Sequence, residues 1–385
     1  MKNQASSDLF AADTAFLRQY IDIRTLESPE GAVVAVSPDL QGRVMTSTAG
    51  SNNAHSYGWI NRSLFESGDT LPHMNAFGGE ERFWLGPEGG QYSIFFKQND
   101  PFDLEHWQTP RLIDLDKFPV RDQNSQKIVF EKEASLTNYS GFTFDFKIER
   151  TVEILSSQKI KSNLNLPEIS DLPMVGYQTV NRVTNTGTSD WQESNGLLSI
   201  WLLGMYNPSE STTIILPYNN GPEEKMGSIV NDDYFGKVPS DRLIVRDNTI
   251  FFKGDGKYRS KIGLNPKRAK NICGAYDAEN QILTIVRYSK PGDVDKYVNS
   301  LWEIQDDPYG GDVINSYNDG PPAPGEAPLG PFFELETSSP ALALKSGNSG
   351  EHIQETYHFE GDEEKLEKIM QQLLGVTVDE VKSIF

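Results

Sequence analysis

The sequence predicts a mainly β protein, and three observations support that fold class. Short runs rich in apolar and aromatic residues recur along the chain and have the patterns typical of strands. Gly, Asn, Asp and Pro separate these runs. Patterns with helical spacing occur only near the two ends. We therefore expect one large β domain over residues 1–385, with an N-terminal extension over 1–30 and a helical segment over 362–385.

The clearest strand pattern lies in Gly141–Leu155, where apolar and polar residues alternate with a period of two. One face of this strand should therefore be buried and the other exposed. Arg150 falls on the apolar face. An inward arginine needs a partner or a pocket, so we expect a buried structural ion pair in preference to a ligand site.

Eight further segments have β-type patterns. They are Ala32–Val36, Lys127–Glu131, Leu197–Leu203, Thr212–Leu216, Leu243–Val245, Ile250–Lys253, Ile282–Tyr288 and Phe332–Leu344. Ile282–Tyr288 is apolar on both faces except at Thr284 and Arg287, which predicts a strand covered on both sides.

Helices are expected only at the ends. Thr14–Ile21 is a short candidate, and Asp362 can cap a second helix over Glu363–Leu374. Thr377 can cap a last turn. The apolar stripe of the second helix favours a packing role, and partner binding is the alternative.

The charge balance limits the possible partners. Lys plus Arg is 35 and Asp plus Glu is 55, so the formal charge is −20. Nucleic acids and anionic membranes attract basic surfaces, so we expect neither as a partner. A neutral small molecule or oligosaccharide remains compatible with this charge. The oligomeric state is left open.

Cofactor, membrane and compartment predictions are mostly negative. The one cysteine, Cys273, excludes an intrachain disulfide and a cysteine-built metal site, and we expect no metal or cofactor. No apolar run reaches the length of a membrane span. The N-terminus lacks an apolar signal core, and its polar start, Lys2–Asp8, would suit the tether of an exported protein. An exported or periplasmic location is expected if a signal was removed, and a cytoplasmic one otherwise.

Gly78–Phe96 combines glycines, charged residues and aromatic rings in one short stretch. Trp84 could stack on the flat face of a sugar, while Arg82 and Glu88 hold its hydroxyl groups. The alternative is a β-hairpin with a salt-bridged tip.

Glu334 and Glu336 lie two positions apart in a predicted strand. That spacing puts both carboxyl groups on one face, with Cα atoms roughly 6.6 Å apart. If the face is enclosed, mutual repulsion raises one pKa and provides a proton donor or base near neutral pH. The alternative is a solvated outer face.

Other candidate binding residues occur in three short segments. The first contains Tyr234, in an acidic aromatic cluster. The second contains Asn318 and Asp319, at a predicted turn, where the alternative role of Asn318 is only to shape the turn. The third contains Arg259 and Lys261, predicted with Lys257 on one strand face. They could neutralise an acidic site, contact an anionic ligand or serve as ion-pair scaffolding.

Histidines supply the remaining acid–base candidates. His73, His106 and His358 could each donate a proton, and Trp107, next to His106, could stack on a ligand. His352 and His358 lie six positions apart, roughly 20 Å on a straight strand, so they could not share a metal ion. Walker, GxGxxG, GxSxG and HExxH motifs are absent.

Several longer segments resemble one protein family nearly from end to end. They are QGRVMTST (41–48), YGWIN (57–61), GGEERFWLGPEGG (78–90), YFGKVPSDR (234–242), YRSKIG (258–263), NSYNDG (315–320) and FELETSSPA (333–341). The resemblance is to an uncharacterised bacterial branch of the galactose mutarotase-like, or aldose 1-epimerase-like, superfamily. It implies a galactose mutarotase-like β-supersandwich with short terminal helices that handles carbohydrates.

The resemblance also implies site residues, but only some of the family's catalytic positions are matched in this sequence. FELETS is similar to the epimerase strand that carries the catalytic base, which corresponds to Glu336. Phe77 stands where the family has a histidine before its glycine pair. Val180–Trp191 is similar to the strand with the catalytic acid histidine, yet it contains no histidine. The base is therefore retained, and the acid is lost or replaced.

These observations lead to two main hypotheses. In the first, the protein is an epimerase-like or mutarotase-like isomerase of carbohydrate metabolism, with Glu336 as base and His73, His106, His358 or a protonated Glu334 as donor. The same two acids could instead serve glycoside hydrolysis or lyase chemistry. In the second, the pocket binds carbohydrate without turnover. A structural module or a non-sugar ligand is a further alternative.

Overall fold

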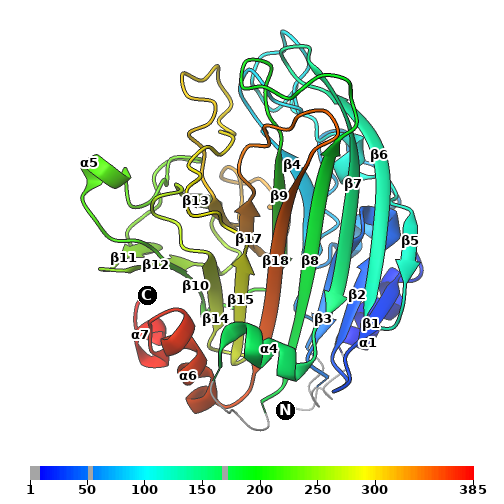
Figure 1. Ribbon diagram of the computed structural model, residues 1–385. Coiled ribbons are helices and arrows are strands. Elements are labelled where there is room, and N and C mark those ends of the chain that lie inside the picture. The colour runs from blue at the N-terminus through cyan, green and yellow to red at the C-terminus, as the bar shows by residue number, and fades with distance from the viewer. Residues whose placement is uncertain (1–8, 51–54, 167–171) are drawn as a thin grey trace.

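The computed structural model describes residues 9–50, 55–166 and 172–385 (Figure 1). The predicted polar start, Lys2–Asp8, lies outside these ranges. Antiparallel sheets dominate the described part, and helices are short. The predicted mainly β fold class is therefore confirmed.

The largest sheet has ten strands in the order β11-β12-β10-β14-β15-β18-β8-β7-β6-β5. Its strands are β5 (Val120–Gln123), β6 (Lys127–Thr137), β7 (Thr143–Ile154), β8 (Met174–Asn185), β10 (Thr212–Pro217), β11 (Leu243–Val245), β12 (Thr249–Lys253), β14 (Ile272–Asp277), β15 (Ile282–Tyr288) and β18 (Ser349–Glu360). Strands β6, β7, β8 and β18 form the long side of the molecule in Figure 1.

A second sheet has five strands in the order β13-β16-β17-β9-β4. Its strands are β4 (Arg82–Gly86), β9 (Ser199–Tyr206), β13 (Ser260–Leu264), β16 (Ile314–Asn318) and β17 (Phe333–Ser338). Strand β17 lies at its centre, so side chains more than 200 positions apart in sequence become neighbours. A third sheet is formed by β1 (Arg24–Glu27), β2 (Val33–Ser37) and β3 (Arg43–Thr48).

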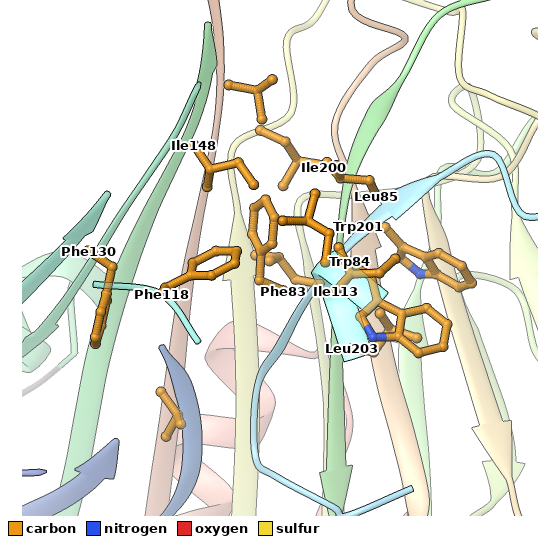
Figure 2. Close-up of a cluster of buried hydrophobic side chains, with 14 of the residues drawn as sticks. Phe83, Trp84, Leu85, Ile113, Phe118, Phe130, Ile148, Ile200, Trp201 and Leu203 are labelled. Carbon is orange, nitrogen blue, oxygen red and sulfur yellow. The ribbon is translucent and has the colours of Figure 1, made fainter. Parts of the chain in front are cut away.

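The two larger sheets bury an apolar core between them. Phe83 and Ile200, from β4 and β9, share a buried cluster with Phe130 and Ile148, from β6 and β7. Figure 2 shows these side chains together, with the indoles of Trp84 and Trp201 lying away from Phe130 and Ile148. The side chains of neighbouring residues on β4 and β9 therefore point to opposite faces of the five-stranded sheet.

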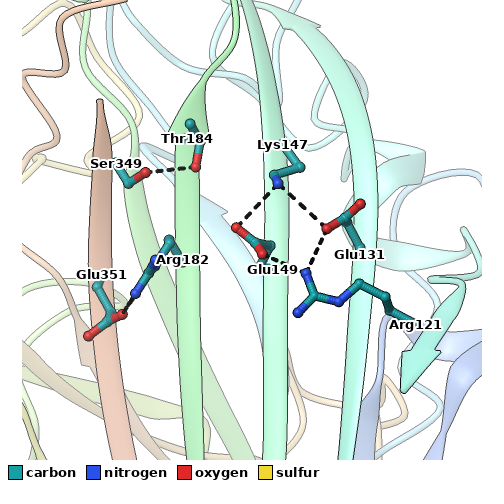
Figure 3. A network of polar contacts seen from close by, with 8 residues as sticks. All are labelled: Arg121, Glu131, Lys147, Glu149, Arg182, Thr184, Ser349 and Glu351. Carbon is teal, nitrogen blue, oxygen red and sulfur yellow. Dashed lines mark hydrogen bonds and ion pairs between the residues drawn. The ribbon is translucent and has the colours of Figure 1, made fainter. Parts of the chain in front are cut away.

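Strand β7 has the predicted alternation. Its even-numbered side chains from Phe144 to Ile154 are buried, including Arg150. Arg150 Nη2 donates to Glu81 Oε1 at 2.9 Å, so the predicted structural ion pair is confirmed. The opposite face carries an exposed polar network, shown in Figure 3. Its members are Arg121, Glu131, Lys147, Glu149, Arg182, Thr184, Ser349 and Glu351.

The described helices are α1 (Leu9–Leu17), α2 (Arg62–Ser67), α3 (Arg111–Asp114), α4 (Ser157–Leu164), α5 (Glu223–Met226), α6 (Glu363–Leu373) and α7 (Val378–Lys382). Helices α4, α6 and α7 cover part of the second face of the ten-stranded sheet. Leu366 and Ile369 of α6 pack in one cluster with Leu283 and Ile285 of β15. The predicted two-sided burial of Ile282–Tyr288 is therefore correct.

The predicted helix caps are also present, since Asp362 accepts from Glu364 N and Thr377 accepts from Glu380 N. The expectation that helices occur only at the ends was wrong. Helices α2 and α4 are short and lie in connections, where a cap and one or two buried side chains suffice to hold them. In the described ranges, none of these helices is long and apolar enough to cross a membrane.

Candidate functional site

The candidate site lies on the face of the five-stranded sheet that points away from the ten-stranded sheet. Arg82 pairs with Leu203, and Leu203 pairs with Glu336. In the next row, Glu334 pairs with Tyr317, and Tyr317 pairs with Lys261. Directly paired residues point to the same face, so strands β4, β13 and β17 bring their charged side chains together. We call Arg82, Lys261, Glu334 and Glu336 the charged cluster.

Glu336 is the most enclosed member of the charged cluster, with no exposed surface. Its Oε2 accepts from Lys261 Nζ at 2.9 Å and from Trp201 Nε1 at 3.0 Å. Its Oε1 is buried and has no hydrogen-bond partner among the described residues. Two N–H donors on one oxygen suit a carboxylate, and Oε1 is left as an atom that can accept a proton.

Glu334 is held by Arg82. Arg82 Nη2 donates to Glu334 Oε1, and the guanidinium carbon lies 5.1 Å from the centre of the Trp84 ring. Burial raises the pKa of Glu334 to about 7, and the positive charge of Arg82 opposes this rise. Arg82 Nε and Trp84 Nε1 are buried without hydrogen-bond partners in the described part of the chain.

Lys261 is surrounded by acids and rings. Burial lowers the pKa of Lys261, but the charges of Glu336 and Glu88 outweigh that effect and raise it above the usual value. Its Nζ lies 5.0 Å from the Trp201 ring centre and 5.5 Å from that of Tyr234. Lys261 is therefore a cation at the physiological pH, and its positive charge stabilises acids on two sides.

Glu88 approaches the charged cluster from the loop after β4. Trp302 Nε1 donates to Glu88 Oε1 at 3.2 Å. Burial raises the pKa of Glu88, while Lys261 and the Trp302 hydrogen bond oppose the rise. The Trp302 ring is stacked on Trp107, with centroids 5.8 Å apart. Glu88 and Trp302 are half-buried, whereas the side chain of Glu336 has no exposed surface.

Two cavities lie among the described residues. One cavity of about 600 Å³ is lined by Phe95, Gln108 and Thr109, which flank Trp107. A second, of about 240 Å³, is lined by Tyr57 and Tyr206. Neither includes Glu334 or Glu336.

The other predicted binding residues form its surroundings. Tyr234 donates its hydroxyl to Asp312 at 2.6 Å, with its ring beside Lys261. Asp319 accepts from the Tyr317 hydroxyl at 2.7 Å, and the Arg259 guanidinium lies 4.0 Å from the Phe235 ring centre. Asn318 accepts from Gly256 N at 2.8 Å and donates to Tyr258 O, which are contacts that shape a turn.

The basic segment 257–261 is split by the fold. Lys257 and Lys261 do not share a strand face, because β13 begins only at Ser260. Lys257 is exposed and pairs with Glu210, whereas Lys261 lies in the charged cluster.

The three candidate histidines lie elsewhere. His358 is buried between the sheets, with Nε2 2.7 Å from Glu80 Oε1. His73 Nδ1 lies 2.6 Å from the Trp107 carbonyl oxygen, and His106 pairs with Asp103 near the surface. In the described ranges, no hydrogen bond or ion pair joins any of them to Glu334 or Glu336. No group of three or more His, Cys, Asp or Glu side chains there is arranged to hold a metal ion.

Sequence reasoning missed Trp201, which donates to Glu336, and Trp302, which donates to Glu88. Trp201 lies in a strand that is buried on both faces, so its pattern does not distinguish the site face from the core face. Trp302 lies in a loop without periodicity. The hairpin alternative for Gly78–Phe96 was wrong, because β4 is the only strand there and it pairs with β9.

Several solved structures are similar to this chain. A protein of Escherichia coli K12, provisionally assigned as an aldose 1-epimerase, matches with a TM-score of 0.50 and 13% identity, over 88% of this chain and 99% of that one. A galactose mutarotase-like protein of Lactobacillus casei ATCC 334 matches with 0.49 and 12%, over 88% and 99%. A provisionally assigned mutarotase of Salmonella typhimurium matches with 0.49 and 10%, over 89% and 92%.

No curated protein matches the chain. The match to the Escherichia coli protein confirms the expected galactose mutarotase-like fold. One family model, described as a family of unknown function (DUF6786), matches residues 8–385. The chain therefore belongs to this family of unknown function, DUF6786, and has the galactose mutarotase-like fold.

Proposed function

We propose that this protein is a carbohydrate-active isomerase that opens and recloses the ring of a sugar hemiacetal, as mutarotases and epimerases do. The observation that carries the proposal is the state of Glu336. Its Oε2 is held by Lys261 and Trp201, while its buried Oε1 has no partner among the described residues. A buried acceptor without a partner costs free energy unless a ligand or water satisfies it.

The surroundings of Glu336 favour a sugar. The rings of Trp84 and Trp201 lie against Arg82 and Lys261, and Trp302, which donates to Glu88, is stacked on Trp107. Arg82 Nε and Trp84 Nε1 are donors without partners in the described part of the chain, and sugar hydroxyls accept from such groups. Arg82 and Lys261 are each already paired with an acid, which favours a neutral sugar over an anionic one.

The chemistry requires one base and one acid. Glu336 Oε1 takes the proton of the anomeric hydroxyl, the carbonyl forms at C1, and the bond from C1 to the ring oxygen breaks while an acid protonates that oxygen. Rotation about the C1–C2 bond and reversal of the same steps return the other anomer. Lys261 stabilises the negative charge that Glu336 carries between turnovers.

A second candidate function is carbohydrate binding without turnover. The observation that favours it is enclosure, because Arg82, Glu334 and Lys261 have side-chain exposures of 4%, 8% and 13%. Both cations of the charged cluster are already engaged by acids. A site of this kind can hold a ligand tightly without moving a proton.

Exchange spectroscopy separates the two functions. Two-dimensional exchange NMR on a panel of neutral aldoses should show faster anomer exchange with the wild-type protein. Glu336→Gln should lower that rate by about 10²–10⁴-fold and leave affinity nearly unchanged, because the amide keeps the shape but cannot accept a proton. Glu105→Gln, on an exposed loop, is the matched control. Binding without exchange in the wild type would favour the second function. A wild-type protein that shows neither binding nor faster exchange would overturn both functions.

A further inference from the structure

We propose that Glu88 is the proton donor that works opposite Glu336, so that a carboxylic acid occupies the role for which the described histidines are wrongly placed. This inference rests on the proposed function. It assigns Glu88 a reacting role instead of hydroxyl binding.

The backbone around Glu88 is anchored at two points. Glu88 N donates to Ser300 Oγ at 3.2 Å, and Glu88 O accepts from Ser93 Oγ at 2.5 Å. The next residue, Gly89, lies so close to the loop that carries Trp302 that a Cβ there would be 2.3 Å from Leu301 O. Glycine at this position therefore lets the two loops touch, and their contact places Glu88 against the Trp302 indole.

Glu88 and Glu336 have opposite environments. Glu336 accepts from a lysine and an indole, both on one oxygen. Glu88 accepts from the Trp302 indole at 3.2 Å, the Trp107 indole also acts on its carboxyl group, and Glu88 makes no ion pair within the described residues. The negative charges of both acids raise the pKa of Lys261, and the charge of Glu336 also adds to the rise in the pKa of Glu88. Carboxyl groups with environments that differ in this way divide into a base and an acid.

Glu334 is less suited to the donor role. It is paired with Arg82 and lies on the same strand face as Glu336. Burial raises the pKa of Glu334 to about 7, but a proton on Glu334 would replace its ion pair with Arg82. Glu88 comes from a loop instead of strand β17 and is half-buried, so the proposal places the sugar ring between Glu88 and Glu336.

The proposed step is balanced without a cofactor. Protonated Glu88 gives its proton to the ring oxygen as the C1–O bond breaks, and Glu336 takes the proton from the anomeric hydroxyl. In ring closure the C5 hydroxyl adds to the C1 carbonyl, Glu88 takes back its proton and Glu336 returns the other. No net proton is gained or lost.

The test compares Glu88→Gln, Glu88→Asp and the control Glu303→Gln, which changes an exposed acid beside Trp302. With a sugar that the wild type interconverts, Glu88→Gln should lower the exchange rate by about 10²–10⁴-fold while affinity stays within about threefold. Glu88→Asp should recover part of the rate, and Glu303→Gln should match the wild type. The wild-type rate should fall at high pH as Glu88 loses its proton, and that limb should vanish in Glu88→Gln.

A direct readout does not depend on the sugar. In protein labelled with ¹³C at the glutamate carboxyl groups, one resonance with a raised pKa should disappear in Glu88→Gln, whose fold is checked by circular dichroism. An exchange rate within twofold of wild type in a folded Glu88→Gln protein would overturn the assignment of Glu88 and leave the proposed function intact. No exchange by the wild-type protein would instead overturn the proposed function.

Discussion

Glu81 and Arg82 are neighbours in sequence, but they belong to two buried charge clusters on opposite sides of the five-stranded sheet. On the core side, Glu81 accepts from Arg150 Nη2 and Gln354 Nε2, both at 2.9 Å. Arg150 also donates to Gly42 O at 3.0 Å and to Asn181 Oδ1 at 2.5 Å. On the other side, Arg82 pairs with Glu334 but keeps Nε without a partner among the described residues.

The difference indicates which cluster is structural. Buried polar groups that are fully hydrogen-bonded specify the packing of a core, and they leave nothing for a ligand to bind. Buried groups without partners need an explanation, and a ligand is one. We therefore interpret the Glu81–Arg150 pair as scaffold and the charged cluster as the candidate site, and the predictions below test this contrast.

The largest expected effect is on the scaffold side. Arg150→Met leaves the carboxylate of Glu81 buried without a cation, which should lower the free energy of unfolding by about 3–5 kcal/mol. Urea unfolding followed by tryptophan fluorescence measures this change. A loss below about 1 kcal/mol would contradict the structural reading of the pair.

A pH effect of similar size should come from His352, which belongs to the same scaffold. Its Nε2 lies 2.8 Å from Thr337 Oγ1, which donates to Gln354. Burial lowers the pKa of His352 to about 3 from the ordinary 6.5. The unfolded chain takes up a proton at this histidine below about pH 6.5, so stability should fall between pH 6.5 and 3, by roughly 4 kcal/mol in total.

The measurement is urea unfolding of the wild type and of His352→Gln at a series of pH values. The variant should lose less stability than the wild type over that interval, because glutamine does not titrate. Parallel curves for the two proteins would show that His352 does not carry the effect.

A smaller effect is expected in the charged cluster, and on binding instead of stability. Trp84 Nε1 has no hydrogen-bond partner among the described residues, so Trp84→Phe removes no internal hydrogen bond. Affinity for a bound sugar should fall by about tenfold, which corresponds to about 1.4 kcal/mol, as one hydrogen bond to the ligand is lost. Calorimetric titration measures it. A large loss of stability with unchanged affinity would place Trp84 in the scaffold.

The smallest effect should come from the exposed network of Figure 3. Arg121 pairs with Glu131 at 3.0 Å and Glu149 at 2.9 Å, but its side chain is 53% exposed. Water and salt screen such pairs, so Arg121→Met should leave the melting temperature nearly unchanged. It is the matched control for Arg150→Met, because the same substitution is made on the other face of the same sheet.

Local patterns predicted what depends on one strand. The period-two alternation of β7 placed Arg150 on the buried face, and the spacing of Glu334 and Glu336 placed both acids on one face. These predictions succeeded because side-chain direction in a strand depends only on position. Helices α2 and α4 were missed because their few buried side chains produce almost no periodic signal.

The residue sequence by itself determined the strand periodicity, the acidic charge and the two-residue spacing of the acids. The partners of those acids were decided by the tertiary structure. Lys261, Trp201 and Trp302 reach Glu336 and Glu88 only because the fold places β9 between β17 and β4, places β13 two strands away from β17, and brings the loop after β15 against the loop after β4. Strand pairing is non-local, so neither these contacts nor the burial that shifts the pKa of Glu88 can be deduced from a pattern within one segment.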